Sequence, residues 1–143
     1  MKTIILTLTV AISSFFANAQ SATNVTAEGT TITVTVPVSS ADGTIIAALY
    51  DENTFMKAAP LQGVESKIEN GVATLTFTNV ASGSYGITLF HDKNGNKIMD
   101  FEANGMPKEM YGVSNNIMSY GPPQWNDAKF EVASEPISME IRM

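Results

Sequence analysis

The sequence predicts an all-β protein, an antiparallel immunoglobulin-like or prealbumin-like sandwich of about seven strands with one long ordered loop. Apolar and polar residues alternate with a period of two in several short segments, and turn dipeptides separate these segments. No segment shows a sustained 3.6-residue period, so no long helix is expected to connect parallel strands. A parallel α/β fold is therefore disfavoured.

Seven segments have the length and composition of strands. In order along the chain they are 31–38, 44–50, 64–69, 73–78, 85–91, 128–132 and 137–143. In the first, Ile32, Val34 and Val36 alternate with threonines, which indicates one buried face. Segment 44–50 (TIIAALY) is almost continuously apolar and predicts a central strand covered on both faces.

Turn signals separate the expected strands. The dipeptides are Asp42-Gly43, Asn70-Gly71 and Ser82-Gly83. Segment 51–63 lacks alternation and is expected to be a connection, with a helical turn around 53–57 that Pro60 prevents from extending.

A long loop is expected over 92–126, where most of the remaining Gly, Pro and Asn residues occur. We expect an ordered loop, because it also carries large apolar side chains that favour burial. They are Met106, Met110, Tyr111, Met118, Tyr120 and Trp125. A loop of this length inside a small domain is uncommon and usually functional.

The N-terminus predicts export. Lys2, the apolar run 4–12 and the small residues of Ala17-Asn18-Ala19 form the three parts of a signal peptide. The expected organisation is a removed signal peptide at 1–19, a flexible lead-in at 20–29 and a single β-sandwich domain at 30–143. The mature protein would then be periplasmic or secreted, without a transmembrane segment, since the apolar run is far shorter than a bilayer span.

Composition limits the function. The net charge is −6, and removal of the signal peptide, which carries Lys2 and no acid, makes it −7. Such an acidic chain repels phosphate backbones, so nucleic-acid binding is not expected. The chain has no Cys and one His, which excludes an ordinary zinc site.

Several sequence blocks between 43 and 132 occur in one order typical of a known family. They are 81–85 (ASGSY), 90–96 (FHDKNGN), Asp100, 105–109 (GMPKE), 111–116 (YGVSNN), 121–123 (GPP) and 125–130 (WNDAKF). In these blocks the chain resembles the uncharacterised bacterial domain-of-unknown-function family 2141. The resemblance implies an exported β domain and supplies no function. Lys97 departs from the family's pattern, which has Gly there.

The start of the long loop is a candidate Ca²⁺ site. Oxygen-bearing side chains recur with the spacing D-x-N-x-N-x-x-x-D, and a main-chain carbonyl follows at the seventh position. The proposed ligands are Asp92, Asn94, Asn96, Ile98 through its carbonyl, and Asp100. Alternate residues of such a loop can turn hard oxygen donors inward, as Ca²⁺ requires.

The match to an EF-hand loop is incomplete. Lys97 stands at the sixth position, where the sharp turn favours Gly, and Ala103 stands where a bidentate Glu is expected. Glu102 lies one position away from that point. The alternative is a turn in which Asp and Asn side chains hydrogen-bond their own backbone.

Three further residues are candidate ligand-binding groups. His91 ends the expected strand 85–91 on the same side as Tyr85, Ile87 and Leu89, where it can order the loop or act as a general base. Tyr111 and Tyr120 can form an aromatic platform for sugars or peptides, or can cover an open end of the sandwich.

The favoured hypothesis is an exported, non-enzymatic binding or accessory module for an unknown extracytoplasmic ligand or protein, with a candidate Ca²⁺ loop at 92–102. No nucleophile, base and acid occur together in a recognised catalytic pattern, which favours this hypothesis. The alternatives are a hydrolase-like enzyme that uses His91 and nearby carboxylates, and a purely structural envelope protein.

Overall fold

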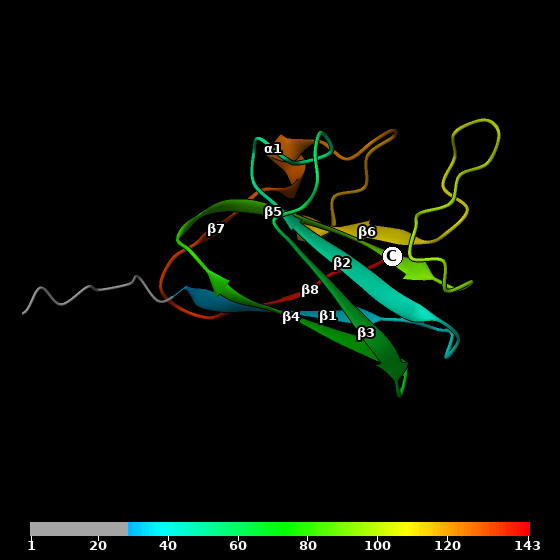
Figure 1. The fold of residues 1–143 in the computed structure, drawn as a ribbon, viewed down its shortest axis with the longest axis horizontal. Helices are drawn as coiled ribbons and strands as arrows, with labels where there is room; N and C mark the ends of the chain where they lie inside the picture. The colour runs from blue at the N-terminus through cyan, green and yellow to red at the C-terminus, as the bar shows by residue number, and fades with distance from the viewer. Residues whose placement is uncertain (1–28) are drawn as a thin grey trace, which may run out of the picture.

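The computed structural model describes residues 29–143, which are mostly β and form an eight-stranded mixed sheet curled into a half-barrel (Figure 1). The strands are β1 (Thr30–Pro37), β2 (Thr44–Tyr50), β3 (Gln62–Glu69), β4 (Val72–Val80), β5 (Gly83–Asp92), β6 (Tyr111–Val113), β7 (Phe130–Val132) and β8 (Ile137–Glu140). Two short helices complete the fold, the 3₁₀-helix η1 (Ser114–Asn116) and α1 (Trp125–Ala128). The predicted signal peptide 1–19 and residues 20–28 of the lead-in lie outside the described part.

Strand order along the sheet is β6-β5-β2-β3-β4-β1-β8, and β7 pairs with the start of β5. The curl passes through β3, whose residues 62–67 pair with β2 and whose last two residues pair with β4. All pairs are antiparallel except β1 and β8, which run parallel. The expectation of a purely antiparallel sandwich is therefore wrong at this edge, because alternation shows which residues face inward and not which way a strand runs.

The core lies inside the curl and is formed mainly by alternate residues of four strands, with Val132 of β7 and Ile141 beside them. Ile32, Val34 and Val36 of β1 are fully buried, and β4 contributes Ala73, Leu75 and Phe77 in the same manner. The facing side chains come from β2 and β5 and are Ile45, Ala47, Leu49, Ile87 and Leu89. Each large apolar side chain buried in this way stabilises the fold by about 1.5–3 kcal/mol.

Two further sequence expectations need correction. Strand β2 is central, between β3 and β5, but its outer face is only half-buried, so it is not covered on both faces. The long loop expected at 92–126 contains β6 and η1, and α1 occupies the start of the strand expected at 128–132. These elements have at most four residues each, which is too short for a periodic signal.

The two ends of the curled sheet approach each other at the C-terminus, which lies beside β6 (Figure 1). The Asn116 side chain joins them: its Nδ2 donates to the Glu140 carbonyl and its Oδ1 accepts from the Arg142 amide, both at 2.8 Å. A Cβ on Gly112 would lie 2.5 Å from the Arg142 carbonyl oxygen, so the close approach requires glycine there.

Candidate functional site

The loop that follows β5 is organised around the Asp92 carboxylate. Asp92 is 1% exposed, and its two oxygens accept the backbone amides of Gly95 at 2.8 Å and Lys97 at 2.9 Å. These charge-assisted hydrogen bonds hold the turn closed from within. Asp92 thus supports the loop backbone, and its carboxylate is engaged on both oxygens.

Three of the predicted metal ligands converge at the surface of this loop. The amide nitrogens of Asn94 and Asn96 donate to the same oxygen, Oδ2 of Asp100, at 2.7 and 2.9 Å. The amide oxygens of Asn94 and Asn96 accept the backbone amides two residues ahead, both at 3.0 Å, which makes two consecutive Asx turns. Ile98, whose carbonyl was the expected ligand, donates the second of these amides.

Lys97 adopts the backbone conformation that the sixth position requires. Its φ is +62°, in the left-handed region that usually favours Gly. Its amide is held by Asp92, and its ammonium lies 2.9 Å from Oε2 of Glu65 on β3. The hydrogen bond from Lys97, assisted by one from Thr44, lowers the pKa of Glu65 below its ordinary value. The departure from Gly therefore leaves the sharp turn intact.

Glu109 is a member of this cluster that sequence reasoning missed. A hairpin over 100–108, closed by the Lys108 amide on the Asp100 carbonyl at 2.9 Å, brings it back to Asp100. Its Oε2 accepts the Asp100 amide at 3.2 Å, whereas its Oε1 is buried and has no partner among residues 29–143. Only the charge of Glu109 was visible in the sequence, since the hairpin has no strand pattern.

Carboxylates alone do not form a metal site here. Within residues 29–143 no three His, Asp or Glu side chains are grouped closely enough to hold an ion. Any cation at this loop would therefore depend on the amide oxygens of Asn94 and Asn96 in addition to Asp100 and Glu109.

His91 lies at the C-terminal end of β5 and is 1% exposed. Like Ile87 and Leu89 it faces inward, as the alternation predicted. Its Nε2 lies 2.6 Å from the Asp42 carbonyl oxygen, so this nitrogen carries the proton and donates. The imidazole and the Asp92 carboxylate bond separate backbone groups, and no hydrogen bond joins them to each other.

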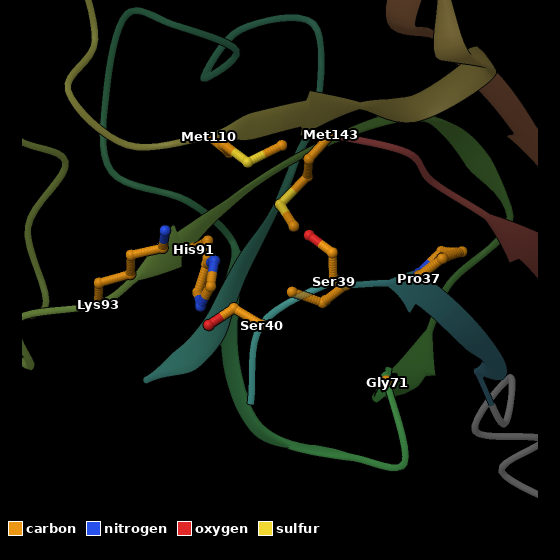
Figure 2. Close-up of a pocket in the computed structure, with 9 residues that line it drawn as sticks. Pro37, Ser39, Ser40, Gly71, His91, Lys93, Met110 and Met143 are labelled. Atoms are coloured by element: carbon orange, nitrogen blue, oxygen red, sulfur yellow. The ribbon is translucent and has the colours of Figure 1, made fainter. Parts of the chain in front are cut away.

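A cavity of about 420 Å³ opens beside His91 (Figure 2). Its walls come from the end of β1, the segment after it, the end of β5 and the C-terminus. The lining residues are Pro37, Val38, Ser39, Ser40, Gly71, His91, Lys93, Met110 and Met143.

Tyr111 and Tyr120, predicted to form one platform, have different surroundings. Tyr111 is 39% exposed and lines a groove of about 380 Å³ with Ile117, Met118 and Arg142. Tyr120 is fully exposed and is not among the residues that line this groove. Trp125 packs against Phe55 with ring centroids 5.6 Å apart and so belongs to the packing of α1.

Comparison with known proteins identifies the family. Residues 31–140 match the family described as "Uncharacterized protein conserved in bacteria (DUF2141)". The chain belongs to DUF2141. Comparisons with curated proteins and with solved structures found no match. The matched segment of this DUF2141 protein runs from β1 to β8, so it contains the Asp92–Asp100 loop, His91 and both tyrosines.

The chemistry available to this DUF2141 protein is divided between two places. The loop after β5 offers hard oxygen atoms from Asp and Asn side chains, whereas the His91 cavity offers an imidazole, hydroxyls and thioethers. None of the helices within residues 29–143 is long and apolar enough to cross a bilayer.

Proposed function

We propose that this DUF2141 protein is an exported, non-enzymatic binding or accessory module, periplasmic or secreted, whose 92–102 loop binds Ca²⁺. The observation that carries the proposal is the convergence of Asn94 and Asn96 on one oxygen of Asp100. The signal-peptide pattern at 1–19 supports export.

A Ca²⁺ ion would bind Oδ2 of Asp100 where the side-chain NH₂ groups of Asn94 and Asn96 now donate to it. Rotation of the Asn94 and Asn96 amides by 180° would turn their oxygens toward the point where their nitrogens now lie, and the ion would have to compensate for the two Asx-turn hydrogen bonds lost in this way. These oxygens, Asp100 and the unpartnered Oε1 of Glu109 are hard donors of the kind that Ca²⁺ prefers. Asp92 would hold the frame of the loop, and the Ile98 carbonyl would complete the set.

The expected affinity is that of an extracellular module, with a dissociation constant of about 0.1–1 mM. At about 1 mM Ca²⁺ and a dissociation constant near 0.1 mM, the ion would add about 1.4 kcal/mol to the free energy of unfolding. The melting temperature would rise by about 5 °C in a domain of this size.

The test is thermal unfolding of the mature protein in excess EDTA and then in millimolar Ca²⁺ or Mg²⁺. A rise with Ca²⁺ that Asp100→Ala and Glu109→Gln abolish, and that Mg²⁺ does not reproduce, supports the site. Glu52→Gln is the matched control, because Glu52 is an exposed acid of a different turn. Equal melting temperatures in EDTA and Ca²⁺ would mean that the loop binds no Ca²⁺ and is only a turn held by its own hydrogen bonds.

We infer that the ligand surface of the module surrounds the groove beside Tyr111. Support comes from the apolar side chains that the 117–123 segment exposes next to it, with Met118 97% and Ile117 50% exposed. Exposed apolar groups that gather at a groove are typical of binding sites. Tyr120, on the same segment, is the second aromatic group available to a ligand.

The finer fold that we infer is an immunoglobulin-like or prealbumin-like sandwich in which the two layers remain joined through β3. Its support is the pairing of β3 with β2 along most of its length and with β4 at its end.

A further inference from the structure

The cavity beside His91 brings together three side chains that bind soft metal ions. They come from distant parts of the chain: His91 from the end of β5, Met110 from the residue before β6, and Met143 from the segment after β8. No Asp or Glu side chain lines this cavity, which distinguishes it from the oxygen-rich loop that follows Asp92.

His91 is arranged as metal-binding histidines usually are. Such a histidine donates one ring N–H to a carbonyl or carboxylate, which fixes the tautomer and leaves the other nitrogen as the ligand. Here Nε2 bonds the Asp42 carbonyl at 2.6 Å, and Nδ1 has no hydrogen-bond partner among the residues that the structure describes. His91 is 1% exposed and lines the cavity, so Nδ1 is free to take a ligand from that cavity.

The carbonyl that orients His91 is itself held firmly. It belongs to the turn before β2, where Gly43 has a φ of +79° and packs on β5. A Cβ on Gly43 would lie 2.3 Å from the Asp92 carbonyl oxygen, so the turn cannot approach β5 this closely with any other residue. The ring orientation is therefore set by backbone packing.

The two methionines reach the same space. The His91 amide bonds the Met110 carbonyl at 2.9 Å, so the two residues are cross-strand neighbours and their side chains project from the same face. Met143 enters from the C-terminal segment, and Figure 2 shows its thioether directed into the space beside the His91 ring and Ser39. Both side chains have three rotatable bonds, so their sulfurs can adjust around an ion.

We propose that the His91 cavity binds a soft monovalent metal ion, Cu(I), through Nδ1 of His91 and the sulfurs of Met110 and Met143. Thioether ligands select Cu(I), and imidazole is a common copper ligand. The donor set is neutral, which suits a monovalent ion better than Ca²⁺ or Mg²⁺. Lys93 also lines the cavity, and its positive charge opposes the ion, so Lys93→Gln should tighten binding.

The test is anaerobic titration of the full mature protein with Cu(I) in competition with the chromogenic chelator bicinchoninate. We expect one Cu(I) per chain. Met110→Leu and Met143→Leu should each weaken binding at least tenfold, because leucine keeps the apolar volume and removes the sulfur. Met118→Leu is the matched control, since Met118 is 97% exposed and does not line this cavity.

His91→Gln tests the nitrogen ligand, because the glutamine amide can still donate to the Asp42 carbonyl. This variant should bind Cu(I) more weakly. The melting temperature of its metal-free form shows whether it still folds. The proposal is overturned if the protein fails to compete with bicinchoninate, or if Met110→Leu and Met143→Leu bind Cu(I) as tightly as Met118→Leu does. Neither result depends on Ca²⁺ at the neighbouring loop.

Discussion

The connection between β5 and α1 has two exposed parts that are ordered in different ways. In the first, residues 92–100, Asp and Asn side chains bond successive backbone amides and meet at Asp100. In the second, residues 117–124, the hydrogen bonds that the structure describes outside η1 all involve Gln124. Met118 and Tyr120 of this part are almost completely exposed.

The difference shows that short polar side chains can order an exposed loop and that exposed apolar side chains cannot. An Asx turn supplies its own hydrogen bonds, so it needs no core beneath it. An apolar side chain contributes stability only when it leaves water. The first part is thus held by hydrogen bonds of its own side chains, whereas the second is anchored at its ends.

Asp92→Ala should have the largest effect on this comparison. It removes the acceptor of two backbone amides in a buried position, so we expect the free energy of unfolding to fall by about 3 kcal/mol. Urea denaturation in EDTA measures the change without a contribution from metal. Asp42→Ala is the control, because the exposed Asp42 side chain accepts no described hydrogen bond. A loss no greater than that of Asp42→Ala would mean that the loop does not depend on its central carboxylate.

Ser114→Ala tests the anchor at which the second part begins. The fully buried Ser114 hydroxyl accepts the Ile87 amide at 3.0 Å and donates to the Ala128 carbonyl. Its removal leaves two buried backbone groups unpaired and should cost about 2 kcal/mol. Chemical denaturation measures the free energy of unfolding of Ser114→Ala and of the control Ser119→Ala, which removes an exposed hydroxyl. Similar stabilities for the two variants would show that η1 is not an anchor.

Acid should weaken the first part more than the second. The hydrogen bond from Lys97, which belongs to the first part, and one from Thr44 lower the pKa of Glu65. A lowered folded-state pKa stabilises the fold above the unfolded value, near pH 4, and this stabilisation is lost as the pH falls through the folded value.

Melting temperatures between pH 6 and pH 2.5 measure this loss. Lys97→Met removes the main cause of the Glu65 shift, so its melting temperature should depend less steeply on pH than that of the unaltered protein. If the melting temperatures of the two proteins had the same dependence on pH, the Lys97–Glu65 pair would not contribute to the stability of the loop.

Tyr120→Ala should have the smallest effect. Because its side chain is fully exposed, the free energy of unfolding should change by less than about 0.5 kcal/mol. Tyr111→Ala, at a partly buried position, should cost more. If Tyr120→Ala lowered the free energy of unfolding about as much as Ser114→Ala, the Tyr120 ring would be packed against the protein in solution. The proposed role of Tyr120 in ligand binding would then fail.

Much of the site was visible as residue types but not as an arrangement. The Asp and Asn spacing identified the loop, and the alternation of 85–91 placed His91 on the inner face. No pattern in the sequence pointed to Glu109, because this residue reaches Asp100 through a hairpin with no periodic pattern. Met110 and Met143 had no sequence signal either, because Met110 approaches His91 through the pairing of β5 with β6 and Met143 through the path of the C-terminal segment.

The amino-acid sequence was sufficient to predict the β-rich class of the protein and the inward faces of its main strands, because the alternation of side chains along a strand is a local property of the pleated backbone. It also determined the turns, because Asn-Gly and Asx chemistry act over a few residues. Three features become visible only in the folded protein: β8 pairs parallel to β1, Asn116 links the two ends of the sheet, and His91, Met110 and Met143 line one cavity. These contacts join residues far apart in the chain, and their free energy depends on the fold as a whole.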